Sequence, residues 1–166
     1  APGFVLLPCE LIEENGKNLK KCILEYCDLW NLDNSFKTWV NEKNSFCSTL
    51  VDRIVPGYPK DDVDRYTNEN GYVDQLLDAA EPFGFWAIEG DEKINDILPF
   101  MKANLPILVT PDISFYKKRK VWILNGGDTS MTAAALLSGL TTVGECMNDE
   151  DVSAFIKKAV YEEIIP

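Results

Sequence analysis

Ile107-Leu108-Val109-Thr110-Pro111-Asp112 is the stretch at which the sequence changes character. Its three apolar residues follow a proline and predict a buried strand. Thr110 as a cap and Pro111 at the first helical position then predict the start of a helix. Predicted strands and helices alternate before this point, whereas only helices are predicted after it. The sequence therefore predicts an α/β fold over residues 1–112 and an all-α fold over residues 113–166.

The part before this stretch contains short apolar runs and amphipathic segments. Strands are predicted over three runs: Phe4–Leu7, 46–55 and 85–88. One helix is predicted from an apolar stripe at helical spacing: Leu19, Cys22, Ile23, Tyr26, Cys27 and Trp30. Two more helices are expected, one capped by Asp33 or Asn34 and one over 72–80.

The part after it is predicted to be helical almost to its end. Two helical runs, 113–125 and about 128–140, flank Gly126-Gly127. A last helix is expected with Asn148 or Asp149 as its cap and an apolar face: Val152, Phe155, Ile156, Ala159 and Val160.

The charge of the chain limits its partners. Its formal net charge is -11, and its densest basic cluster is Lys117-Lys118-Arg119-Lys120. Such a field repels phosphate backbones, so nucleic-acid binding is not expected. An anionic substrate would need a local cationic pocket, which draws attention to that cluster. No stretch approaches the roughly 18 to 20 apolar residues of a membrane span, so no membrane association is expected.

The chain has no histidine and five cysteines. The first fact removes Ser-His-Asp and Cys-His catalysis and histidine-ligated zinc. The cysteines are odd in number and form no C-x-x-C pair, which is typical of reduced thiols in a cytoplasmic protein and argues against a metal site. The start at Ala1-Pro2, without methionine, leads us to expect a fragment or a processed chain.

The best candidate for chemistry is the segment from Lys120 to Asp128. Neighbouring cations and burial would both lower the pKa of Lys120, and a lysine of lowered pKa exchanges protons with an alcohol or a carbonyl. The side-chain amide of Asn125 could hold a developing oxyanion. Gly126-Gly127 would leave room for a flat ring such as a nicotinamide. The competing interpretation is a solvated basic face followed by a helix end.

Helix geometry works against this pair. Five residues turn about 140° around an ideal α-helix, so Lys120 and Asn125 would barely share a face. Asp128, three residues after Asn125, does share its face. Convergence of the lysine and the asparagine therefore requires the length of the lysine side chain or a distortion at the glycines.

Two other places carry candidate residues. Pro8-Cys9-Glu10 follows a predicted strand, where α/β proteins often place functional groups. Asp52-Arg53 lies within an apolar run, and a structural ion pair is an alternative to a functional role there. No G-x-G-x-x-G or G-x-x-x-x-G-K-[ST] pattern occurs in the chain.

Several long motifs resemble one family. Leu7–Ile12 with Asn15-Gly16, Phe46–Pro59 and Arg119–Gly126 are similar to segments of the mannitol dehydrogenase family of long-chain polyol dehydrogenases. Phe85–Gly90 and Glu162–Pro166 fit the same branch. The resemblance runs in the same order through essentially the whole chain, and within the family it is closest to the branch that acts on tagaturonate and altronate.

The resemblance implies a fold and a cofactor. It implies the end of a Rossmann-type domain, without its glycine-rich loop, over residues 1–112, and the start of a mostly helical domain over residues 113–166. The family uses NAD or NADP and no metal, and NAD is the cofactor we expect. Pro8, Cys9 and Glu10 are expected to bind it.

The resemblance also implies roles for individual residues. The family motif K-x4-N-x2-H maps onto Lys120 as the general acid/base and Asn125 as the oxyanion donor, with Asp128 in the place of the histidine. Asp52 and Arg53 are expected beside the substrate, and Arg53 or Lys118 is expected to bind its carboxylate.

The expected function is therefore NAD-dependent interconversion of tagaturonate and altronate, with a sugar acid as the small-molecule partner. As a fragment, the chain is expected to be inactive alone. Two alternatives stay open: a degenerate or truncated non-enzymatic binding module, and a related reductase of fructuronate or a polyol. The sequence makes no prediction of the oligomeric state.

Overall fold

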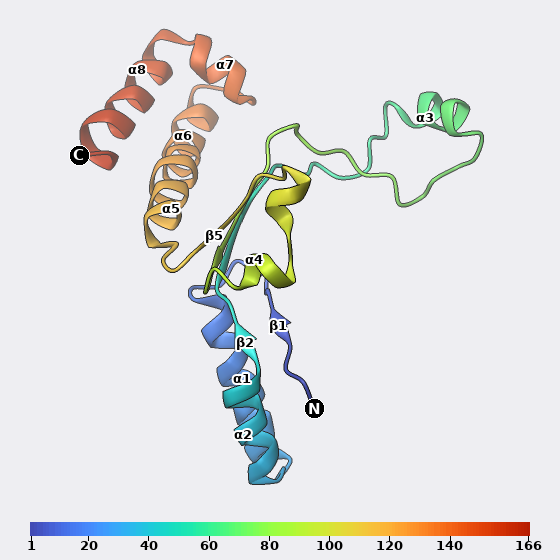
Figure 1. Ribbon diagram of the computed structural model, residues 1–166. Helices are drawn as coiled ribbons and strands as arrows, with labels where there is room; N and C mark the ends of the chain where they lie inside the picture. Colours follow the sequence, from blue (N-terminus) through green and yellow to red (C-terminus); the bar gives the residue numbers. More distant parts are fainter. The chain divides into compact units, whose positions relative to one another are not determined.

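A computed structural model describes the backbone of residues 1–166 and every side chain except that of Met101. The chain divides into two compact units, Ala1–Pro111 and Asp112–Pro166. All the strands lie in the first unit, and the second unit is helical (Figure 1).

The first unit begins with a small layer of two strands and two helices. β1 (Val5–Leu6) pairs in parallel with β2 (Ser45–Phe46), and α1 (Asn15–Leu29) and α2 (Asn34–Lys43) connect them. Asp33 caps α2, because its carboxylate accepts a hydrogen bond from the Ser35 N–H at 2.6 Å, which confirms the predicted start.

The prediction of α1 from its apolar stripe is correct in the helical period, but the expectation that the whole stripe is buried is wrong. Cys27 is the buried member at 1% exposure, whereas Tyr26 is 53% and Trp30 64% exposed. The reason is that α1 packs mainly against α2 and β2, so the contact covers only part of the stripe.

A three-stranded sheet forms the centre of the first unit. β4 (Phe85–Glu89) lies between β3 (Thr49–Asp52), to which it is antiparallel, and β5 (Ile107–Thr110), to which it is parallel. The predicted strand over 46–55 is instead two strands, β2 and β3, in two different sheets. The core under the sheet contains Cys47, Ile88 and Ile94.

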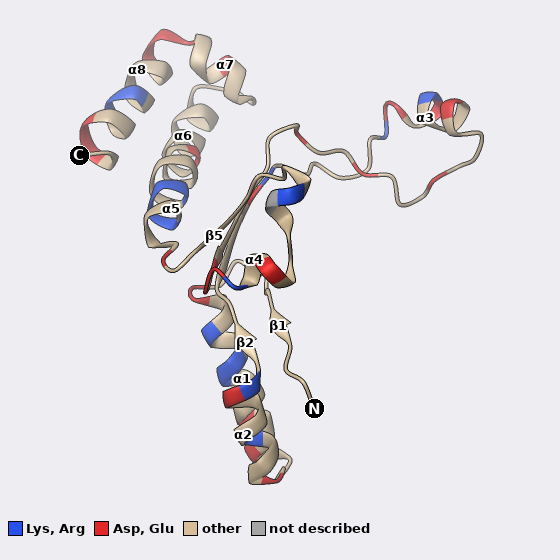
Figure 2. Cartoon of the chain, in the orientation of Figure 1, with Lys and Arg blue, Asp and Glu red and all other residues tan. Residues whose placement is uncertain are grey.

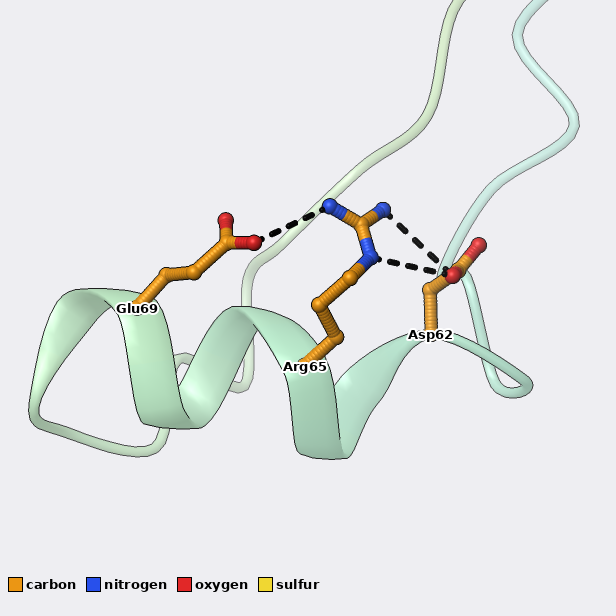
Figure 3. A network of polar contacts seen from close by, with 3 residues as sticks. All are labelled: Asp62, Arg65 and Glu69. Carbon is orange, nitrogen blue, oxygen red and sulfur yellow. Dashed lines mark hydrogen bonds and ion pairs between the residues drawn. The ribbon is translucent and has the colours of Figure 1, made fainter.

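The connection from β3 to β4 differs from the prediction. The helix expected over 72–80 is absent there, and α3 (Val63–Asn70) lies earlier in the same connection (Figure 1). Gly71 adopts the left-handed conformation, with φ of 77°, and ends α3. The side chain of Arg65 contacts Asp62 one turn before it and Glu69 one turn after it (Figure 3). Two short helices, α4 (Ile94–Ile97) and η1 (Phe100–Ala103), connect β4 to β5.

The expected helix start at Thr110 is also wrong. Thr110 is the last residue of β5, where its carbonyl oxygen accepts a hydrogen bond from the Gly90 N–H at 2.9 Å. This sheet contact keeps Thr110 extended. The helix begins four residues later with α5 (Ser114–Lys118), and the Asp112 carboxylate accepts a hydrogen bond from the Ser114 N–H at 2.8 Å.

The second unit is a chain of helices without strands. α5 continues through a π-helical turn, η2 (Arg119–Asn125), into α6 (Gly126–Leu137). Two further helices follow, α7 (Val143–Asn148) and α8 (Glu150–Lys158). The unit ends with a second π-helical turn, η3 (Ala159–Ile164). Met131, Ala135, Cys146, Val152 and Ile156 form its core. Asp149 caps α8 by accepting a hydrogen bond from the Val152 N–H at 2.9 Å, which confirms the predicted cap.

α7 starts with a capping box in which Thr142 and Glu145 satisfy each other's backbone N–H groups. The Glu145 carboxylate accepts hydrogen bonds from the Thr141 N–H at 2.8 Å and the Thr142 N–H at 2.9 Å. These bonds, those from Thr141 first, lower the pKa of Glu145 to about 2.

Replacement of Glu145 by Gln is expected to lower the Tm near neutral pH and to flatten its dependence on pH. A carboxyl group whose pKa is lowered by folding stabilises the fold above its unfolded pKa, and this stabilisation is lost as the pH falls toward about 2. Tm measured by circular dichroism between about pH 5 and pH 2 tests this. Glu162→Gln, at an exposed carboxylate of the same unit, is the control, and equal slopes for wild type and Glu145→Gln would contradict the expectation.

Candidate functional site

The predicted site residues lie in both units. Pro8, Cys9, Glu10, Asp52 and Arg53 belong to the first unit, and Lys118, Lys120, Asn125 and Asp128 belong to the second. Among the residues with described side chains, no cluster of three or more Cys, Asp or Glu side chains could hold a metal ion. The same residues include no helix that could cross a membrane.

The loop after β1 is held by the side chain of Asn15, which is 4% exposed. Its amide nitrogen donates to the carbonyl oxygens of Pro8 at 2.9 Å, Glu10 at 3.1 Å and Thr49 at 3.2 Å. Its amide oxygen accepts hydrogen bonds from the N–H groups of Gly16 at 2.9 Å and Thr49 at 2.8 Å. One side chain therefore joins the end of β1, the start of α1 and the start of β3.

Gly16 allows α1 to approach the strands closely enough for these bonds. A Cβ atom on Gly16 would lie 2.5 Å from the carbonyl carbon and 2.6 Å from the carbonyl oxygen of Cys47. Backbone atoms cannot yield at that distance, so a side chain at this position would push the helix away. The pair Asn15-Gly16 thus sets the distance between α1 and the link from β2 to β3.

Within the first unit, Cys9, Asp52 and Arg53 line one pocket of about 330 Å³. The rest of its wall is largely apolar and includes Val51, Trp86 and Ile107. The structure thus brings together three of the five residues predicted in this unit. Pro8 and Glu10 contribute backbone carbonyl groups to Asn15.

The guanidinium group of Arg53 lies at the rim of this pocket. Its Nε donates a hydrogen bond to the carbonyl oxygen of Phe83 at 2.8 Å, and its Nη2 is 3.4 Å from that of Pro82. These bonds tie the end of β3 to the segment that leads into β4 and orient the side chain.

Trp86, which the sequence did not single out, also lines this pocket. Its indole Nε1 is buried and has no hydrogen-bond partner among the described atoms. A buried donor without a partner is costly to the fold. The tryptophan lies in an apolar run that predicts only a strand, so no sequence signal distinguished it.

In the second unit, Lys120 is half-buried, whereas Lys118, Asn125 and Asp128 are exposed. Figure 2 shows basic residues gathered at α5. The ammonium group of Lys118 lies 5.9 Å from the ring centroid of Trp122, within the range of a cation–π contact.

The glycines after Asn125 do not end the helix, contrary to one interpretation of the sequence. Gly126 has φ of -64° and ψ of -41°, and α6 continues without a break. Cβ atoms added to Gly126 and Gly127 would lie at ordinary contact distance, 3.6 Å, from Ile164 and Val160 of η3, and Gly126 also lines a hollow. η3 therefore lies against both glycines, and room for a flat ring at Gly126 stays a prediction.

The helix is instead distorted before the glycines. Over Arg119–Asn125 it is a π-helix, and the Gly126 N–H bonds to the carbonyl oxygens of Val121, five residues earlier, and Ile123, three residues earlier. Both flanking residues, Lys118 and Gly126, have ordinary α-helical angles. The distortion that the lysine–asparagine pair required is thus present, but in the residues between them.

A second hollow, of about 550 Å³, lies beside this π turn. Of the predicted residues of this unit, Asn125 lines it, together with Trp122, Thr129 and Glu163. Thr129 lies four residues after Asn125 on the same helix face, a spacing that could have indicated it. Glu163 is adjacent to Glu162, and such exposed acidic pairs are typical of a solvated surface.

Comparison with known proteins gives matches along the chain. The family model described as the mannitol dehydrogenase Rossmann domain matches residues 1–100, and that of the mannitol dehydrogenase C-terminal domain matches residues 112–166. Altronate oxidoreductase of Enterobacter sp. (strain 638) is 49% identical over 99% of this chain, and that of Shigella flexneri is 48% identical over the same share. The chain spans about a third of the length of these relatives, 34% in each case.

Two solved structures have a similar fold. A D-sorbitol dehydrogenase in substrate-free form aligns with a TM-score of 0.79 at 23% identity, covering 98% of this chain and 32% of that one. Mannitol 2-dehydrogenase of Pseudomonas fluorescens, in a ternary complex with NAD and D-mannitol, aligns with a TM-score of 0.69 at 24% identity, covering 99% and 33%. The expected fold class, a Rossmann-type region followed by a helical region, is confirmed.

Replacement of Asn15 by Ala is expected to destabilise the first unit by about 3 kcal/mol, since the buried Thr49 N–H loses its hydrogen bond to Asn15 and an unsatisfied buried group costs about 1–3 kcal/mol. Urea unfolding followed by tryptophan fluorescence measures this. The control is Asn41→Ala, which removes an exposed amide that bonds to the Lys37 carbonyl oxygen. An effect of Asn15→Ala as small as that of the control would show that Asn15 does not hold the loop.

Proposed function

The chain belongs to the mannitol dehydrogenase family, and from this premise we propose that the whole protein is an NAD-dependent oxidoreductase that interconverts tagaturonate and altronate. The observation that carries this proposal is the identity of 48 to 49%, over 99% of the chain, to proteins named altronate oxidoreductase. Residues 1–112 would be the later part of its dinucleotide-binding domain, and residues 113–166 the start of its helical domain.

The first unit fits part of a dinucleotide. Its pocket of about 330 Å³ is near the lower limit for a ligand site and suits one ring with its substituents. The apolar wall would contact the faces of a ring. The 166 residues carry no glycine-rich loop, so the phosphates would bind to residues outside this chain.

In the proposed reaction, NAD would supply the hydride chemistry, as acceptor when altronate is oxidised and, in its reduced form, as donor when tagaturonate is reduced. The amine of Lys120 takes the hydroxyl proton during oxidation and gives it back during reduction. The Asn125 amide donates a hydrogen bond to the substrate oxygen while it carries negative charge. The Asp128 carboxylate accepts hydrogen bonds from neighbouring substrate hydroxyl groups.

A cation must bind the substrate carboxylate, because the chain as a whole carries a net charge of -11. Arg53 and Lys118 are the two candidates. The guanidinium group of Arg53 is oriented by the carbonyl groups of Phe83 and Pro82, which supports a fixed role. Lys118 is exposed, beside the ring of Trp122.

A cytoplasmic location is part of the proposal. The five cysteines are all free thiols in the structure: Cys9 and Cys22 are exposed, and Cys27, Cys47 and Cys146 are buried. Exposed thiols persist in a reducing compartment. A small sugar acid, a product of carbohydrate metabolism, fits the same compartment.

Lys120→Ala in the full-length protein is expected to lower kcat for altronate oxidation roughly 10²- to 10⁴-fold, because the step loses its proton acceptor. NAD binding, measured by fluorescence titration, should change less than about twofold, since Lys120 acts on the substrate oxygen. Lys157→Ala, at an exposed lysine of α8, is the control. Unchanged turnover in Lys120→Ala would remove this lysine from the mechanism.

A substrate panel separates the proposal from its alternatives. NADH oxidation with tagaturonate, fructuronate and a neutral ketose should be fastest with tagaturonate. A preference for fructuronate or the ketose would reassign the substrate. A full-length protein that turns over none of them would favour a non-enzymatic binding module, an alternative motivated by Asp128 in the place of the family histidine.

A further inference from the structure

The strongest unexplained feature of the second unit is the π turn between two predicted catalytic residues. Lys120 is its second residue and Asn125 its last. π turns are rare, occur mostly as single turns within α-helices, and concentrate at functional sites. The turn is embedded between α5 and α6, and its flanking residues, Lys118 and Gly126, are α-helical.

The turn changes which residues share a face. In an α-helix, the hydrogen bond joins residues four apart, so a residue lies above the one four positions earlier. In a π turn, the bond joins residues five apart, and a residue lies above the one five positions earlier. Lys120 and Asn125 are five apart, so the π turn brings their Cα–Cβ bonds to one side, whereas an α-helix would separate them by about 140°.

A second π turn packs against the first. The Ile165 N–H bonds to the carbonyl oxygen of Val160, five residues earlier, at 3.0 Å. Val160 and Ile164 of this turn lie against Gly127 and Gly126, where added Cβ atoms would each be 3.6 Å away. This packing supports the first turn at its C-terminal end, next to Asn125.

We propose that the π turn Arg119–Asn125 is a positioning device, whose one additional residue per turn brings the Lys120 amine and the Asn125 amide to the same substrate oxygen. This inference rests on the proposed function. It gives a physical reason for the K-x4-N spacing. Two residues five positions apart share a helix face in a π turn but not in an ordinary α-helix.

The device can be tested by removing the additional residue. Deletion of Leu124 leaves the lysine and the asparagine four apart, and an ordinary α-helix then places them on one face. Leu124 suits the deletion because it is 45% exposed and does not line the hollow beside Asn125. The full-length deletion variant is expected to keep kcat within about tenfold of wild type, with the same pH dependence of kcat.

The opposite test moves the lysine and keeps the length. The exchange Lys120→Val with Val121→Lys places the lysine four residues before Asn125, the favourable spacing for an α-helix and the wrong one for a π turn. It should lose as much turnover as Lys120→Ala, roughly 10²-fold or more. Lys120→Ala introduced into the Leu124 deletion should abolish the retained activity, which would show that the same lysine acts in both backgrounds.

Each result decides one question. An exchange variant that is active, or a Leu124 deletion that folds with a wild-type circular dichroism spectrum but loses turnover, would overturn the positioning role while the enzyme itself stays established. If the deletion fails to fold, the exchange variant alone decides. A wild-type protein without altronate oxidation would instead overturn the proposed function.

Deletion of Thr132, in the regular part of α6, is the control and should destabilise the unit by shifting the register of Met131 and Ala135.

Discussion

The first unit depends on the hydrogen bonds made by one buried amide. The side chain of Asn15 binds to backbone groups of Pro8, Glu10, Gly16 and Thr49, so it joins two strands and a helix that are far apart in the sequence. Buried backbone groups require partners, and a loop at a strand end has few available. An asparagine supplies both donors and an acceptor from one position, which few other side chains can do. Thr49 begins β3, so this anchor also sets the position of Asp52 at the far end of the same strand.

In the second unit, the proposed site requires two side chains of one helix, those of Lys120 and Asn125, to lie on the same face. There the device lies in the backbone, a π turn whose hydrogen bond spans five residues. Such a turn is disfavoured in isolation and persists only where packing supports it. Val160 and Ile164 of η3 lie against Gly127 and Gly126, and η3 contains the same kind of turn.

Part of this architecture was predictable from local pattern. The strands at Phe85–Glu89 and Ile107–Thr110 follow from short apolar runs between glycine and proline, and the caps at Asp33 and Asp149 follow from the preference of aspartate for that position. The helix expected over 72–80 was wrong because the Ala79 N–H bonds to the Gly57 carbonyl oxygen in an isolated β-bridge, a contact between distant residues that sequence period does not reveal. Thr110 was assigned to a helix cap because its sheet bond to Gly90 is non-local.

By itself, the sequence determined the change from an α/β region to a helical one near residue 111, the absence of histidine chemistry, and the family motifs that nominate Lys120 and Asn125. These depend on composition and on neighbours along the chain. Only the tertiary structure decided that Asn15 is a buried hub, that Cys9, Asp52 and Arg53 line one pocket, and that the turn after Lys118 is a π turn. Each of these depends on contacts between distant residues, and the π turn is stabilised by η3, more than thirty residues further along the chain.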